Sequence, residues 1–260
     1  MLKIDKKVWL YLLLYIIILV VSALVLKGKV DSLVKIGLSQ GIALVVLVLL
    51  FSSRKLVIGL GPNFKVSNFK YIVPLFIILL MYALIRTDFL NYQENSFPFI
   101  CYVLFIIFIQ TLTEEMVFRG LVLNNYLKKG LNVHQAVIYS SVIFGLFHFV
   151  AIFGKTPVES IVNQVLMAIM CGIFLGAIFV LTRNIYLAGL IHLLINIPSY
   201  FNSNSKVEKN TDVNLDLYSD PSFLEMVLST SMIVLIYSPF LIVGLFLLSK
   251  ARKAFENNPL

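Results

Sequence analysis

The chain has 260 residues, of which 60% are hydrophobic and 13% are charged, whereas about a quarter of the residues are charged in a soluble globular domain. This composition excludes a soluble fold and predicts an integral membrane protein, organised as one polytopic domain over residues 1–260. The formal net charge of +8 comes from Lys and Arg residues that flank apolar runs, as they do in the loops of membrane proteins. No basic stripe interleaves with aromatic residues, so no nucleic-acid partner is expected.

Eight apolar runs predict an all-α fold, with about eight transmembrane helices packed as one bundle around a buried polar site. The first run is followed by Lys27 and Lys29 rather than by a small-residue cleavage site, so it is interpreted as a span and not as a signal peptide. The fourth run extends over about 30 residues, or ~45 Å, which is longer than a hydrocarbon core requires. We therefore expect it to tilt or to break near Gly120. The runs cover residues 8–26, 36–51, 71–85, 97–127, 135–153, 160–182, 185–200 and 223–248.

Small residues and cysteines within these runs carry two further expectations. Ala168, Gly172 and Gly176 recur at four-residue spacing in the sixth run, and such a face lets another helix approach closely. Cys101 and Cys171 lie in apolar runs without the spacing of a disulfide framework or of a zinc finger, so both are expected to be buried apolar residues.

The distribution of positive charge predicts the orientation of the chain in a plasma membrane. Eight spans put both termini on one side, and 13 of the 21 Lys and Arg residues lie in segments on that side, with 7 on the other and Arg119 inside the fourth span. Since loops rich in Lys and Arg stay in the cytoplasm, both termini are predicted to be cytoplasmic.

Three ionisable residues, Glu114, Glu115 and Arg119, lie within six residues of one another in the fourth span. Each costs roughly 2.5–3.5 kcal/mol at the centre of a membrane helix, so such residues are rare and usually functional. Glu115 and Arg119 are i,i+4 neighbours in the favourable acid-before-base order and can offset each other. Glu114 lies about 100° further round the helix, so its carboxylate is left to face another group.

Two of the three histidines, His148 and His192, lie inside the fifth and seventh spans, whereas His134 lies at a polar helix start. A single intramembrane histidine is often a packing residue, but two histidines and an unpaired glutamate on three helices can bind and deprotonate a water. They can do so through a metal, by general-base catalysis or by both. The HExxH signature of soluble zinc peptidases is absent, and so is the GxSxG motif of serine hydrolases. Both mechanisms are therefore disfavoured.

The ordered motifs EExxxR, FxxxH and HxxxN on successive spans resemble those of the CPBP family, which includes the type II CAAX prenyl endopeptidases and the bacteriocin-processing and self-immunity proteins of bacteria. The resemblance covers a motif-bearing core of about residues 97–200. The matching positions are Glu114, Glu115, Arg119, Phe144, His148, His192 and Asn196.

The resemblance implies a role for each of these residues. Glu114 would be the general base that activates water, and His148 would share that water or a metal. His192 and Asn196 would face the scissile carbonyl, as a metal ligand and an oxyanion donor or as a pair of donors. Glu115 with Arg119 would be the supporting pair of the fourth span, and Phe144 would form a wall of the site.

The resemblance implies an intramembrane endopeptidase that hydrolyses a peptide bond of a membrane-associated peptide or protein near the cytoplasmic half of the lipid bilayer. Glu114, His148 and His192 would suit one divalent metal, most naturally zinc, as in a metalloprotease, and a metal-free glutamate–histidine mechanism is equally compatible. Two alternatives remain open at this point. One is a catalytically inert bacteriocin-immunity or scaffold protein of the same fold. The other is an ion-coupled transporter, although the sequence has no paired broken helices in corresponding halves.

Overall fold

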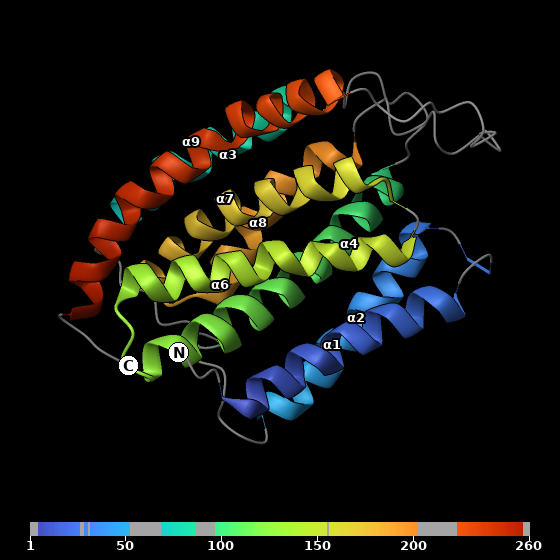
Figure 1. The fold of residues 1–260 in the computed structure, drawn as a ribbon, viewed down its shortest axis with the longest axis horizontal. Helices are drawn as coiled ribbons and strands as arrows, with labels where there is room; N and C mark the ends of the chain where they lie inside the picture. The colour runs from blue at the N-terminus through green and yellow to red at the C-terminus, as the bar shows by residue number, and fades with distance from the viewer. Residues whose placement is uncertain are drawn as a thin grey trace.

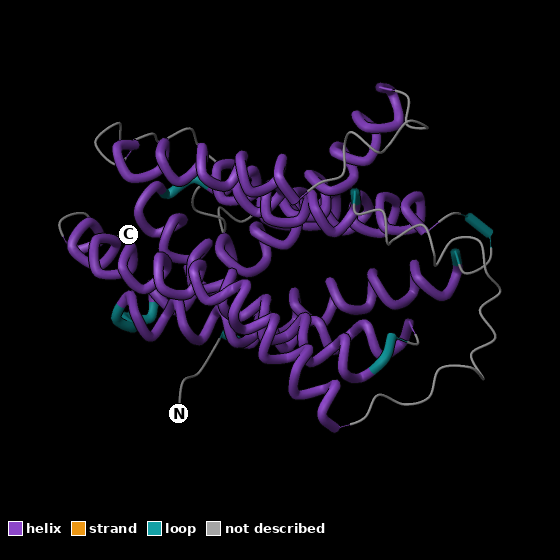
Figure 2. Tube along the Cα trace, turned by 90° about the horizontal axis from the view of Figure 1, so that it is seen from above, coloured by secondary structure: helices purple, strands orange, loops and turns teal. Residues whose placement is uncertain are grey.

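The computed structural model describes residues 5–26, 29–30, 32–52, 69–86, 97–154, 156–201 and 223–256. All regular secondary structure within these ranges is helical, and none of them contains a strand. The helices run side by side along the long axis of the molecule (Figure 1), and the view from above shows the same bundle with only short described loops (Figure 2). The all-α expectation is therefore confirmed.

Each of the eight predicted spans corresponds to one helical unit of the structure. Within the described ranges, six units are long and apolar enough to cross a membrane, and the seventh run forms a shorter apolar helix. The last helix continues beyond its predicted end at residue 248. The helices are α1 (Lys6–Val25), α2 (Ser32–Ser52), α3 (Phe69–Arg86), α4 (Phe97–Glu115), α5 (Asn124–Lys128), α6 (Val133–Phe147), α7 (Val158–Thr182), α8 (Ile185–Tyr200) and α9 (Phe223–Glu256).

The fourth span changes its helical geometry directly after the paired glutamates. α4 ends at Glu115, and the next segment, η3 (Met116–Leu123), is π-helical before α5 resumes the α-helix. A π-helix hydrogen-bonds from residue i to i+5, which widens the helix and often occurs at functional sites. The hydroxyl of Ser140 on α6 donates to the Phe118 carbonyl of this segment at 3.0 Å. The helix therefore does not break near Gly120 but stays continuous and changes its geometry from Met116 to Leu123.

Close packing between α6 and α7 depends on glycines of the sixth run. A Cβ atom on Gly172 would lie 2.9 Å from the Cβ of Ser141, and one on Gly176 would lie 2.9 Å from a methyl group of Val137. These separations are shorter than carbon atoms tolerate, so the two helices approach this closely only where α7 lacks side chains. The predicted small-residue face of α7 is therefore confirmed.

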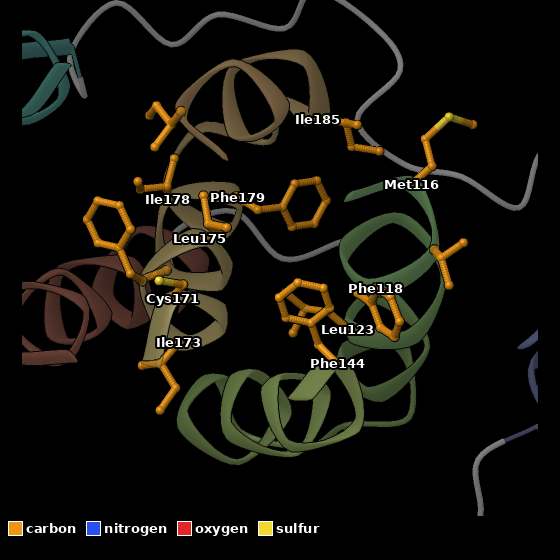
Figure 3. Close-up of a cluster of buried hydrophobic side chains, with 14 of the residues drawn as sticks. Met116, Phe118, Leu123, Phe144, Cys171, Ile173, Leu175, Ile178, Phe179 and Ile185 are labelled. Carbon is orange, nitrogen blue, oxygen red and sulfur yellow. The ribbon is translucent and has the colours of Figure 1, made fainter. Parts of the chain in front are cut away.

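Buried apolar side chains fill the centre of the bundle where α6, α7 and η3 meet (Figure 3). The rings of Phe118 and Phe144 lie 4.8 Å apart between centroids, and Phe179 enters the same cluster from α7. This cluster holds together the helices that carry the predicted catalytic residues. Cys171 is buried as expected, but the expectation for Cys101 is wrong, because its side chain is exposed on α4.

A two-residue turn joins α7 to α8 and sets the start of the helix that carries His192. Arg183 adopts a left-handed conformation with φ of 53°, and the Asn184 side chain caps α8 by accepting a hydrogen bond from the Leu187 backbone at 2.9 Å. The guanidinium of Arg183 lies 4.9 Å from the centroid of the Phe255 ring, and burial lowers the pKa of Arg183 from its ordinary value. This turn and the C-terminal part of α9 therefore stabilise each other.

Candidate functional site

A cavity of about 400 Å³ lies between α4, α6, α7, α8 and α9. All four residues predicted to be catalytic line it, although they come from three different helical units. They are Glu114, His148, His192 and Asn196. Phe144 lines it as well, as a wall residue should. The structure therefore brings the sequence-predicted site residues together around one space.

Glu115 does more than pair with Arg119. Its side chain is fully buried, with Oε2 at 3.0 Å from Arg119 Nε and Oε1 at 2.9 Å from His192 Nδ1. An ionised carboxylate can only accept hydrogen bonds, so His192 Nδ1 must carry a hydrogen and donate it to Glu115. That arrangement turns the other ring nitrogen, Nε2, towards the cavity. The sequence predicted the ion pair with Arg119 but had no signal for the contact with His192, which lies on a different helix.

Glu114 points its carboxylate the other way, into the cavity. Its Oε2 lies 3.8 Å from His192 Nε2, and its Oε1 accepts a hydrogen bond from the Gln110 side chain at 3.2 Å. Gln110 in turn accepts a hydrogen bond from the Tyr200 hydroxyl at 2.6 Å. Gln110 and Tyr200 were not predicted as site residues. The i,i+4 spacing of Gln110 and Glu114 was the only signal in the sequence that could have identified either of them.

His148 lies where α6 ends and the 3₁₀ segment η4 (His148–Gly154) begins. Its Nδ1 is 3.1 Å from the Phe144 carbonyl oxygen, and since a carbonyl only accepts, Nδ1 donates this bond and Nε2 is left for other contacts. The Phe144 ring lies edge-on to both histidine rings, with centroids at 5.2 Å from His148 and 5.8 Å from His192. Arg119 packs against the same phenyl ring, with its guanidinium carbon 4.7 Å from the centroid. Phe144 thus packs against both histidines.

The predicted metal ligands do not form a closed set in this arrangement. Zinc bound by nitrogen and oxygen donors at about 2.0–2.2 Å needs its ligands within a few ångströms of one another. Within the part of the chain that the structure describes, no three His, Cys, Asp or Glu side chains are grouped closely enough to hold a metal ion. Glu114 and His192 supply two convergent donors. The residues as placed do not fit a three-ligand metal site.

Residues 96–198 match a family model described as "Type II CAAX prenyl endopeptidase Rce1-like". The matched segment contains every residue of the three motifs, and it extends from the start of α4 to Pro198 in the last turn of α8. A comparison with curated proteins finds no match.

Proposed function

We propose that this chain, in which residues 96–198 match the model of type II CAAX prenyl endopeptidases, is an intramembrane endopeptidase. Its reaction would be hydrolysis of a peptide bond in a membrane-associated peptide or protein. The family is a protease family, and the helical bundle supplies the membrane setting. The nucleophile in this proposal is a water molecule activated by Glu114.

The observation that carries the proposal is the approach of Glu114 Oε2 to His192 Nε2 at 3.8 Å. With Nδ1 protonated towards Glu115, a neutral His192 presents an acceptor at Nε2, and Glu114 presents a second acceptor. Two acceptors at this distance can each take one hydrogen of the same water molecule. That water would have its lone pairs free to attack a carbonyl carbon, with the carboxylate placed to remove a proton.

The reaction then follows from the donors around this water. Glu114 takes a proton from the water as its oxygen bonds to the carbonyl carbon, which converts the carbonyl oxygen to an oxyanion. The Asn196 amide can donate to that oxyanion, and a donor aimed at such a charge in a dry site typically contributes several kcal/mol. Glu114 returns the proton to the amine nitrogen as the carbon–nitrogen bond breaks. The products are a carboxylic acid and an amine, which exchange a proton to give a carboxylate and an ammonium group, and Glu114 is ionised again.

The test compares the peptides of membranes that contain the wild-type chain, the Glu114→Gln variant or a matched Glu256→Gln control. Glu256 is exposed at the end of α9 and pairs with Arg252, so its substitution makes the same chemical change far from the cavity. We expect specific peptides to be lost with Glu114→Gln and retained with Glu256→Gln. Unchanged processing in the Glu114→Gln variant, or unchanged protection from a bacteriocin where the chain confers it, would rule out the mechanism and favour an inert immunity protein.

Metal dependence is tested separately on the purified chain. The steps above use only protein groups and water, so we expect processing to survive exhaustive chelation. Loss of processing on chelation with recovery on adding Zn²⁺ would instead assign Glu114, His148 and His192 as metal ligands. A bound zinc ion would then lower the pKa of its water and polarise the scissile carbonyl.

A further inference from the structure

A chain of two hydrogen bonds crosses the cavity from the end of α8 to Glu114 on α4. The Tyr200 hydroxyl donates to Gln110 Oε1 at 2.6 Å, and Gln110 Nε2 donates to Glu114 Oε1 at 3.2 Å. All three side chains line the cavity, where Gln110 and Tyr200 are half-buried. Neither of these two residues belongs to the EExxxR, FxxxH or HxxxN motifs. The motifs therefore leave the role of this hydrogen-bonded pair unassigned.

The direction of each bond follows from the chemistry of its partners. An ionised Glu114 carboxylate only accepts hydrogen bonds, so Gln110 must face it with the nitrogen end of its amide. The amide oxygen of Gln110 then faces away from Glu114 and needs a donor, which the Tyr200 hydroxyl supplies. An amide turned the other way would place its oxygen against the carboxylate, where neither group can donate. Tyr200 therefore favours the orientation in which Gln110 can hold the glutamate.

Glu114 depends on this bond more than Glu115 depends on any single contact. Glu115 is held at both of its oxygens, by Arg119 and by His192. Among the described residues, the bond from Gln110 is the one side-chain hydrogen bond that Glu114 accepts, because His192 Nε2 lies 3.8 Å from its other oxygen, beyond hydrogen-bond distance. The terminal torsion of a glutamate side chain is broad, so a carboxylate without such a bond can turn. The contact at Oε1 therefore determines where Oε2 points.

The packing of α4 against α8 does not need this pair. Further along α4, the buried contact between Glu115 and His192 already joins the two helices. A hydrogen bond between half-buried groups contributes only modestly to stability, because both groups can bond to water instead. Loss of the bond between Gln110 and Tyr200 should therefore change the orientation of Glu114 more than it changes the fold.

We propose that Gln110 and Tyr200 are positioning residues for the general base, with Tyr200 orienting the Gln110 amide and Gln110 holding Glu114 Oε1. Oε2 then stays directed towards the water that Glu114 shares with His192, and it is the oxygen that receives the proton of this water. The neutral acid keeps Oε1 as its carbonyl oxygen, so the bond from Gln110 lasts until Oε2 returns the proton to the amine nitrogen. This assignment rests on the proposed peptidase function, and it adds which oxygen of Glu114 reacts and which two residues select it.

Kinetics of three variants test whether Tyr200 acts through Gln110. Gln110→Met keeps the length of the side chain and removes the amide, whereas Tyr200→Phe removes only the hydroxyl. With a peptide found by the peptidome comparison, we expect kcat to fall about tenfold in Gln110→Met and severalfold in Tyr200→Phe, with KM little changed. The double variant should be no slower than Gln110→Met alone, because a hydroxyl that acts on the amide has no effect once the amide is gone. Effects that multiply in the double variant, or an unchanged kcat in either single variant, would overturn the proposal.

Tyr15→Phe is the matched control for a purely structural effect. The Tyr15 hydroxyl donates to Gln40 Oε1 at 3.0 Å between α1 and α2, so this variant loses the same kind of bond in a more buried place. Neither Tyr15 nor Gln40 is among the residues that line the cavity. We expect Tyr15→Phe to lower the melting temperature at least as much as Tyr200→Phe does while leaving kcat unchanged. A kcat that followed the melting temperature across all variants would assign Gln110 and Tyr200 a structural role instead.

A measurement without catalysis separates this proposal from the peptidase function. The infrared difference spectrum between a chain and its Glu114→Gln counterpart isolates the carboxylate stretching bands of Glu114, which shift when a hydrogen bond to one oxygen is lost. We expect these bands to shift in the Gln110→Met background, to shift less with Tyr200→Phe and to stay in place with Tyr15→Phe. Unchanged bands in Gln110→Met would overturn the proposal even if processing slowed. Bands that shift as expected in a chain that processes no peptide would refute the peptidase function but not the hold of Gln110 on Glu114.

Discussion

The adjacent glutamates of the fourth span should respond in opposite ways to the same substitution. Glu115→Gln removes the charge that holds Arg119 and His192, both of which are buried. Glu114→Gln removes a charge that faces the cavity and is held by one hydrogen bond from Gln110. We therefore expect Glu115→Gln to lower stability and Glu114→Gln to lower activity.

The magnitudes follow from burial. Glu115 is 0% exposed and Arg119 is 1% exposed, and breaking such a pair by removing one partner costs about 3–5 kcal/mol, because the other charge stays buried. For a chain of this size that corresponds to a fall in melting temperature of roughly 10 °C. Glu114→Gln should change stability by less than about 1 kcal/mol and can even stabilise, because a buried carboxylate with few partners is itself unfavourable. Its activity should fall by about 10²–10⁴-fold, which is the usual contribution of a general base.

Thermal unfolding in detergent, followed by intrinsic fluorescence, measures the first effect, and processing of a peptide found by the peptidome comparison measures the second. The double variant Glu115→Gln with Arg119→Met removes both buried charges. We expect it to be more stable than either single variant by at least about 1 kcal/mol, because no uncompensated charge remains. Equal melting temperatures for Glu115→Gln and Glu114→Gln would refute the division between a structural and a reactive carboxylate.

Three further changes test other parts of the site. Asn196→Ala should lower kcat by about 10²–10³-fold with little effect on KM, because a lost oxyanion donor acts mainly in the transition state; steady-state kinetics with a peptide substrate measure both constants. Gly172→Leu should lower the free energy of unfolding by about 1–3 kcal/mol, because the larger side chain overpacks against Ser141. Gly172→Ala should lower it by less, and thermal unfolding measures both effects. Asn184→Ala should cost about 1 kcal/mol, because it removes the cap of α8, and a melting temperature equal to that of the wild type would contradict this role.

The helices were predictable because each is an apolar run with polar ends, and only helices and closed barrels span a membrane. Their limits were less predictable, since α9 continues to Glu256 and α6 ends at Phe147. The i,i+4 pairing of Glu115 with Arg119 was predictable for a similar reason, since both residues lie on one helix. The small-residue face of α7 was predictable from spacing alone, and it packs against Ser141 and Val137 on α6 as expected.

Contacts between distant helices were not predictable. His192 lies 77 positions from Glu115, and Tyr200 lies 90 positions from Gln110, so no local pattern connects either pair. The error at Cys101 has another physical cause. In a membrane an apolar residue can face lipid as readily as protein, so an apolar run does not say which of its faces is buried.

The helical geometry explains why two neighbouring carboxylates have different surroundings. One residue of an α-helix turns the side chain by about 100°, which directs Glu115 to Arg119 and to His192 Nδ1, and Glu114 to the cavity and to His192 Nε2. Both glutamates thus contact the same imidazole on its two nitrogens. Glu115 fixes the protonation and orientation of the ring, and that in turn fixes the acceptor that faces Glu114. An inert scaffold would need only the first of these contacts for its stability. The second places the Glu114 carboxylate against the cavity, 3.8 Å from His192 Nε2, where a general base needs to be.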